Sequence, residues 1–241
     1  MNRDKEIREK HKRRQRLYIS LMLLLLAFVT MTAATVAWFT IADRGRVDSM
    51  NMDVTAGTSL RFDLDSHDEF EEYTETLQFQ QIAGRIQAEH GFNMKTVPLE
   101  PVTTGNGQNF RFEDGSAVSV RSGAYLEFRL HFMAMSDMDV HLTGKDGRNG
   151  KQGTKITSKN PKLAGAMRIS FTADGRTYIY DPGKTAEMKL FSLEQEKDKE
   201  VIVRIWLEGT DENCTSDIQG SDYSISMRFV GTDENGKVIE E

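Results

Sequence analysis

The residues that could support chemistry in this 241-residue chain are a few histidines, some acidic side chains and one cysteine. His131 and His141 fall on the polar faces of two neighbouring predicted strands, so their imidazoles could lie close together. A zinc site normally needs three or four ligands and a second layer of supporting hydrogen bonds. Because no His-Glu-x-x-His pattern accompanies the pair, the favoured interpretation is two ordinary surface histidines.

An acidic cluster at residues 67–72 offers a second possible site, this time for a cation. It reads His-Asp-Glu-Phe-Glu-Glu and precedes an apolar pattern typical of a helix. Acidic side chains near a helix N-terminus are stabilising without any bound ion. We therefore favour a solvated helix start over a cation site.

Nucleophilic and cofactor chemistry have little support in the sequence. Cys214 is the only cysteine, so no intramolecular disulfide forms, and a buried structural thiol is favoured over pairing between chains. The sequence contains no nucleophile elbow, no phosphate-binding loop and no Rossmann glycine fingerprint. We predict no catalytic residues, no metal site and no cofactor, and a protein that is not an enzyme.

The longest apolar stretch, residues 17–42, has no charged side chain and predicts an N-terminal hydrophobic helix. A helix over these residues would be roughly 39 Å long, enough to cross a hydrocarbon core of about 30 Å. Residues 1–16 carry eight basic and three acidic residues, a net charge of +5. Because basic flanks remain in the cytoplasm, we expect a cytoplasmic head at 1–16 and an extracytoplasmic body, with the membrane as at least a transient partner.

The stretch at 17–42 is either a cleaved signal peptide or a retained signal anchor. Small residues at Thr35 and Ala37 suit the −3 and −1 positions of a signal peptidase, which places cleavage between Ala37 and Trp38. Against cleavage, the apolar run is long and continues through Trp38 and Phe39, an aromatic pair suited to a membrane interface. Both interpretations deliver the body, secreted or membrane-anchored, to the cell surface.

After a charged linker at 43–49, residues 50–241 are predicted to form one β-rich domain. The whole chain carries a net charge of −6, which leaves −11 for residues 17–241 and argues against nucleic-acid binding. Period-two alternation of apolar and polar residues predicts strands in seven segments. These segments are 60–64, 125–132, 138–142, 167–171, 177–180, 201–207 and 225–229.

Other segments complete the predicted domain. Residues 66–90 space their apolar side chains as one or two short helices do, 91–116 are irregular, and 144–159 form a polar loop rich in glycine and lysine. Asp174-Gly175 between two predicted strands is typical of a hairpin turn. The fold class is therefore mainly β, an antiparallel two-sheet sandwich with one or two short helices.

The start of the body has a small-residue cut site and an aromatic element, Thr35-Val36-Ala37-Trp38-Phe39-Thr40, followed by Thr55-Ala56-Gly57-Thr58-Ser59-Leu60. This arrangement resembles the TasA/camelysin family, whose members are exported surface and biofilm-matrix proteins of Gram-positive bacteria. Ile41 stands where the family has an acidic residue, and Asp43 follows two positions later. The resemblance covers about 25 residues of this chain.

This resemblance implies a jelly-roll-like sandwich and a structural role in surface or matrix fibres, assembled by lending an N-terminal strand to the next subunit. Physically, such lending is strand addition to an open sheet edge. The implied donor is the segment Trp38–Leu64, which cleavage would free. Its candidate strand residues are Thr55, Ala56, Gly57, Thr58, Leu60 and Phe62. Alternatively, the same segment pairs within its own domain.

Two other functions remain open. One is a glycan-binding module, in which Tyr178, Tyr180, Trp206 and Tyr223 would stack on sugars, although core packing is favoured for most of them. The other, less favoured, is a metalloprotease of camelysin type, for which the chain has no recognisable metal motif.

Overall fold

The structure is a computed structural model that describes residues 15, 18–26, 46–54 (backbone only), 59–148, 152–184 and 186–239. The chain divides into two units, Met1–Ala42 and Asp43–Glu241. Residues 18–26 are helical. Among the described residues, no helix is long and apolar enough to cross a membrane. Most of the stretch predicted as an N-terminal hydrophobic helix, residue 17 and residues 27–42, lies outside the described residues.

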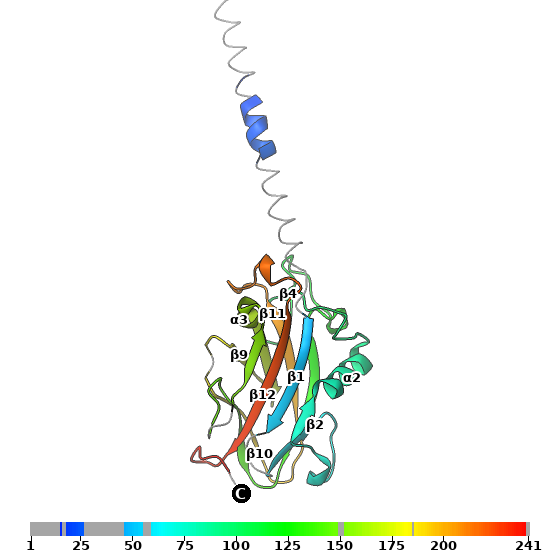
Figure 1. Cartoon of the computed structure of the whole chain (residues 1–241), viewed down its shortest axis with the longest axis vertical. Helices are drawn as coiled ribbons and strands as arrows, with labels where there is room; N and C mark the ends of the chain where they lie inside the picture. Colours follow the sequence, from blue (N-terminus) through cyan, green and yellow to red (C-terminus); the bar gives the residue numbers. More distant parts are fainter. Residues whose placement is uncertain are drawn as a thin grey trace, which may run out of the picture. The chain divides into compact units, whose positions relative to one another are not determined.

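The second unit is a sandwich of two sheets, which confirms the fold class predicted from the sequence (Figure 1). We call the first the β12 sheet, with strand order β10-β6-β12-β1-β3 and β7 paired with β12. Its strands are β1 (Arg46–Val54), β3 (Thr76–Gln78), β6 (Met138–Leu142), β7 (Lys155–Ser158), β10 (Met188–Leu193) and β12 (Asp222–Thr232).

The second sheet, the β11 sheet, has the order β2-β5-β11-β8-β9, with β4 also paired with β11. Its strands are β2 (Leu60–Asp63), β4 (Pro101–Val102), β5 (Leu126–Ala134), β8 (Met167–Ala173), β9 (Arg176–Tyr180) and β11 (Lys199–Glu208). Pairing is antiparallel except between β1 and β12 and between β4 and β11.

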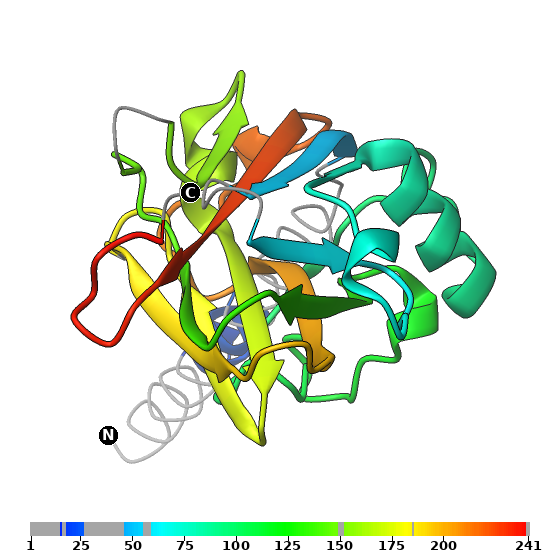
Figure 2. The same ribbon diagram turned by 90° about the horizontal axis from the view of Figure 1, so that it is seen from below.

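Short helices flank the sheets. The α-helices are α2 (Phe79–His90) and α3 (Pro161–Ala166), and the 3₁₀ turns are η1 (Phe70–Glu72), η2 (Val120–Ser122) and η3 (Ser216–Ile218). The helices η1 and α2 occur within 66–90, where the sequence predicted them. Helix α2 buries Phe79, Ile82 and Ile86 and lies along one side of the strands, as Figure 2 shows.

The core forms where the inward faces of the two sheets meet. The rings of Phe62 and Phe132 from the β11 sheet contact Phe229 from the β12 sheet, with centroids 5.8 Å and 5.1 Å from it. All three side chains are fully buried. Alternation explains this packing, because every second residue of each strand points to the partner sheet.

The hairpin predicted at Asp174-Gly175 is confirmed. Strands β8 and β9 pair up to Ala173 and Arg176, and the two turn residues have φ angles of 50° and 73°. Such a turn matches the right-handed twist of the flanking strands, and glycine adopts positive φ at low cost. The hairpin places β9 at the edge of the β11 sheet.

Three parts of the fold differ from the sequence-based expectations. Strand β1 begins at Arg46, inside the segment expected to be a linker. Strand β7 occupies four residues of the segment 144–159 that was expected to be a loop, and the prediction had no strand at β10.

Candidate functional site

A groove of about 560 Å³ lies beside β7 in the described part of the chain, and we call it the β7 groove. Strand β7 forms one wall. The last residue of β9, Tyr180, and the turn residues Pro182 and Gly183 form the other. Helix α3 and the loop residues Lys145 and Asp146 complete the lining. The volume lies within the usual range of ligand sites, about 300–1,000 Å³.

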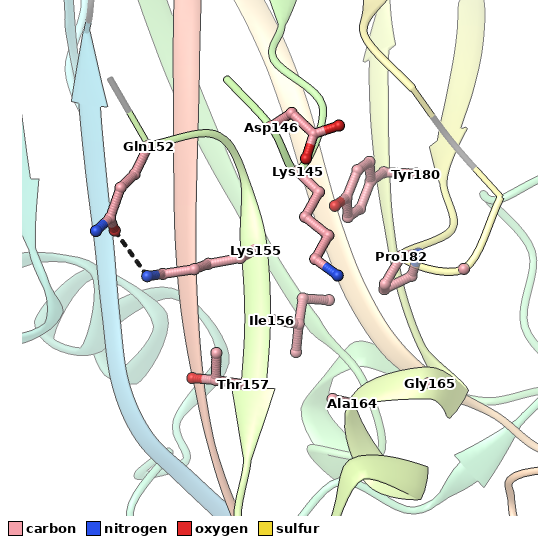
Figure 3. A pocket seen from close by; sticks show the side chains of 11 residues that line it. Lys145, Asp146, Gln152, Lys155, Ile156, Thr157, Ala164, Gly165, Tyr180 and Pro182 are labelled. Atoms are coloured by element: carbon pink, nitrogen blue, oxygen red, sulfur yellow. Dashed lines mark hydrogen bonds between the residues drawn. The ribbon is translucent and has the colours of Figure 1, made fainter. Parts of the chain in front are cut away.

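The β7 groove combines apolar walls with a lysine that reaches into it. Figure 3 shows the Lys145 side chain passing beside Tyr180 and ending between Ile156 and Pro182. Lys145 makes no hydrogen bond or ion pair with another described residue, and this includes its neighbour Asp146. Lys155 instead turns toward Gln152 and donates a hydrogen bond of 2.7 Å to its Oε1.

Close backbone packing positions the loop that carries Lys145. A Cβ atom on Gly153 would lie 1.7 Å from the carbonyl oxygen of Gly144 and 2.5 Å from the nitrogen of Gly147. Any side chain at Gly153 would therefore separate the two ends of the loop. Arg148, farther along the loop, donates two hydrogen bonds to the Glu187 carboxylate, which ties the loop to the segment before β10.

Glu187 also lies beside His141 of β6. Its Oε1 is 3.1 Å from His141 Nδ1, and His141 Nε2 is 3.2 Å from the hydroxyl of Thr232. Burial lowers the pKa of His141 below its ordinary value, and this effect outweighs the opposing attraction of Glu187. A neutral imidazole is thus the favoured form beside this loop.

A buried ion cluster supports the opposite end of the groove. The guanidinium of Arg168 lies between the carboxylates of Asp181, at 3.2 Å, and Asp211. Burial raises the pKa of Asp211, but hydrogen bonds from Asn213 and the Arg168 cation outweigh it and leave the pKa below its ordinary value. These ionised partners hold the turn after β9 in place.

The second candidate functional feature is the pairing of strand β1 with its neighbours in the β12 sheet. Strand β1 pairs in parallel with β12 from Arg46–Asp222 to Val54–Phe229, with one irregularity between Val47 and Ser49. On its other edge it pairs with β3 through only three residue pairs. Figure 1 shows β1 and β12 side by side along most of their length. The first strand of the domain is therefore held chiefly by the last one.

The implied donor residues divide between described and undescribed parts of the chain. Leu60 and Phe62 belong to β2, pair with Ala134 and Phe132 of β5 in the same chain, and are fully buried. Residues 55–58, and Ala37 and Trp38 at the expected cleavage point, lie outside the described residues. The described pairs match the alternative in which this segment pairs within its own domain.

The two histidines that the sequence placed on neighbouring strands are not brought together, so this expectation is wrong. His131 lies on β5 in the β11 sheet and His141 on β6 in the β12 sheet. Each alternates with core residues and so faces outward from its own sheet. Alternation gave the correct face of each strand, but the two strands belong to different sheets.

His131 takes part in a polar cluster that the sequence did not reveal. The carboxylate of Asp198 lies 2.8 Å from His131 Nδ1 and accepts hydrogen bonds from the hydroxyls of Ser66 and Tyr73. These residues come from three distant parts of the sequence, so no local pattern could identify them. The cluster attaches the acidic segment before η1 to the β11 sheet.

The acidic side chains of residues 68–72 are exposed, as expected for a solvated segment. Among the described residues, no group of three His, Cys, Asp or Glu side chains could hold a metal ion.

The aromatic side chains considered for sugar stacking are mostly in the interior. Trp206, Tyr180 and Tyr223 are each about 1% exposed, and only Tyr178 is partly accessible. Trp206 lies under the segment 100–125, in a small apolar cluster with Phe110 and Tyr125. Stacking of sugars on the three buried rings is therefore excluded in this conformation.

Cys214 is a free, half-buried thiol packed against the core. Burial, with the nearby charges of Asp211 and Glu208, raises its pKa to about 11. Because the thiolate is the reactive form, this environment favours a structural role.

The sequence missed the β7 groove residues Lys145 and Ile156. One signal was present: residues 144–159 carry five basic and one acidic residue, a net charge of +4 in an acidic chain.

No protein-family model matches this chain, and no curated protein sequence matches it.

Proposed function

We propose that this protein is an exported structural component of the cell surface or extracellular matrix, and that it assembles by exchanging its N-terminal strand β1 between copies. The observation that carries the proposal is the pairing of β1: eight residue pairs with β12, only three with β3, and a position at the start of the domain. Exchange of a first strand needs no rethreading of the remaining chain.

The exchanged element is β1, which lies within the implied donor segment Trp38–Leu64, rather than the residues at 55–62. Leu60 and Phe62 fill the core between the sheets, so removing them would open a large apolar cavity. Strand β1 is separated from β2 by residues 55–59. It can therefore be replaced by the same strand of a neighbour without disturbing the pairing between β2 and β5.

The energetic basis is strand addition. A chain without its β1 exposes the edge of β12 along residues 222–229, and unpaired N–H and C=O groups there accept a matching strand. The same β1 sequence pairs with β12 whether β1 comes from the same chain or from a neighbour. Exchange therefore keeps the main-chain hydrogen bonds between the two strands, and the added free-energy cost is that of bringing two chains together. A head-to-tail contact of this kind forms open fibres unless the rotation closes a ring.

Export is the second part of the proposal. Residues 17–42 are apolar and uncharged and follow a basic head, the arrangement of a signal peptide or signal anchor. N-terminal sequencing of protein recovered from outside the cell tests it. A start at Trp38 supports cleavage after Ala37, an intact N-terminus supports a retained anchor, and recovery of the folded protein only from the cytosol contradicts export.

A disulfide trap tests strand exchange. Asn51 and Ser226 are direct partners across β1 and β12, and Arg129 and Ile202 are partners across β5 and β11. The double variants Asn51→Cys/Ser226→Cys and Arg129→Cys/Ile202→Cys are made with Cys214→Ser in the chain from Trp38 onward. This chain contains the whole compact unit Asp43–Glu241.

The proposal predicts a different covalent product from each pair. In assembled material, oxidation of the β1–β12 pair gives a ladder of cross-linked chains on a non-reducing gel. The β5–β11 pair gives single chains, because both strands stay in one subunit. Fibres in which the β1–β12 pair also gives only single chains contradict strand exchange, and so does a protein that never assembles.

A further inference from the structure

The β7 groove lies at an edge of the β12 sheet that no described strand covers. Strand β7 pairs with β12 from Tyr223–Ser158 to Ser226–Lys155 and with no other described strand. Within the described residues, the backbone of β7 makes no hydrogen bond on its outer side. In an antiparallel strand, alternate residues turn their N–H and C=O groups to each edge, so β7 presents free main-chain donors and acceptors there.

The other end of β12 shows how further strands can extend this edge of the sheet. There β12 pairs with β6, and β6 pairs in turn with β10. Strands β6 and β7 occupy the same edge of β12 at successive positions along its length. The β7 groove therefore corresponds to the position that β10 fills beside β6, and an added strand would extend the sheet in the same way.

The charge of the β7 groove selects among possible strands. Lys145 extends into it between Ile156 and Pro182, and no described carboxylate pairs with it (Figure 3). Of the carboxylates near the groove, Asp181 pairs with Arg168 and Glu187 pairs with Arg148. Asp146 also lines the groove and forms no ion pair with a described residue, so it offsets part of the positive charge there. Segment 144–159 has a net charge of +4, against −10 for the rest of the chain. This positively charged edge therefore attracts an acidic partner more strongly than a neutral partner.

We propose that the β7 groove binds an extended acidic peptide, which adds as a strand to the outer edge of β7 and places a carboxylate against the Lys145 ammonium. Main-chain hydrogen bonds to β7 supply affinity, and the apolar wall formed by Ile156 and Pro182 takes an alternate side chain. The groove lies beyond β7, on the opposite edge of β12 from β1. Peptide binding is thus independent of strand exchange, and either proposal can fail alone.

Three synthetic hexapeptides test this binding in solution. The first is acetylated and amidated, alternates threonine and valine, and carries one central glutamate. The second replaces glutamate with glutamine, and the third carries N-methyl groups on alternate amides, which removes their main-chain donors. Each is titrated into the isotopically labelled chain from Trp38 onward, with dissociation constants read from amide shifts and hydrogen exchange followed at residues 155–158.

Matched variants separate the role of Lys145 from that of general charge. Lys145→Gln removes the groove cation. Lys197→Gln removes an exposed cation in the β10–β11 turn, where Glu194 is its one ion-pair partner among the described residues. We expect the glutamate peptide to slow exchange in β7, and about tenfold weaker binding with the glutamine peptide or with Lys145→Gln. Lys197→Gln leaves binding unchanged, and the N-methylated peptide does not bind.

Four results would overturn the proposal. They are absence of binding by the glutamate peptide, equal binding in the two lysine variants, equal binding of the glutamate and N-methylated peptides, and equal protection of β7 by glutarate alone. The last result would show a site for small acids rather than for a strand.

Discussion

Asp198 accepts a hydrogen bond of 3.0 Å from the phenol of Tyr73, which lies 125 residues earlier in the chain. The same carboxylate accepts a hydrogen bond from Ser66 and contacts His131 Nδ1. One side chain in the turn before β11 therefore anchors the segment between β2 and β3 at Ser66 and Tyr73. Substitution of Asp198 therefore tests how this polar cluster stabilises the outer face of the β11 sheet.

We expect Asp198→Ala to lower the free energy of unfolding by roughly 2–3 kcal/mol, because it removes the charged acceptor of the Ser66 and Tyr73 hydroxyls and the polar partner of His131. Urea unfolding followed by circular dichroism measures the change. Glu194→Ala is the control, since Glu194 is exposed and pairs only with Lys197; it should change stability by less than about 0.5 kcal/mol. Equal effects of the two substitutions would contradict the anchoring role.

Phe132 joins the two sheets through its ring contacts. Its centroid lies 5.2 Å from that of Phe191 and 5.1 Å from that of Phe229, both in the opposite sheet. We expect Phe132→Ala to destabilise the domain by about 3–5 kcal/mol, because it leaves a cavity between the sheets. Thermal unfolding checks this. Met135→Ala, one residue past the same strand and 50% exposed, should be nearly neutral, and a comparable loss there would argue against the cavity explanation.

Gly153 has no room for a side chain, since a Cβ would lie 1.7 Å from the Gly144 oxygen. We expect Gly153→Ala to separate the loop ends and to destabilise the domain by about 1–3 kcal/mol. Because the same loop carries Lys145, the variant should also shift the amide signals of Gly165 and Gly183 in the β7 groove. Gly105→Ala is the matched control, with no atom within 4 Å of the added carbon. Unchanged groove signals in Gly153→Ala would contradict the coupling.

The pKa of His141 gives a prediction about pH. Burial places this pKa below the ordinary value of 6.5, so below pH 6.5 the unfolded chain takes up a proton more readily than the folded one. The contribution of His141 to stability is fully present above pH 6.5 and is lost as the pH falls toward its folded value. His141→Gln should therefore show a shallower loss of unfolding free energy as the pH falls through and below 6.5. Parallel curves for the two proteins would contradict this assignment.

Sequence patterns predicted the long strands well. Alternation in 125–132 and 201–207 corresponds to β5 and β11, whose apolar faces are buried in the core. It failed at β10, where a register shift between Lys189 and Phe191 breaks the alternation, so that Leu190 and Phe191 are both buried. It also failed at β7, where pairing with β12 outweighs a local sequence rich in glycine and lysine.

The amino-acid sequence by itself determined the fold class, the hairpin at Asp174-Gly175 and the outward faces of the strands that carry His131 and His141. These features depend on the two-residue period of a strand and on turn chemistry, which are local. Only the tertiary structure decided which strands share a sheet, that β1 lies beside the last strand, and that Lys145 extends into a groove beside β7. Those relationships join residues distant in sequence, and they depend on how the two sheets pair and pack rather than on any local pattern.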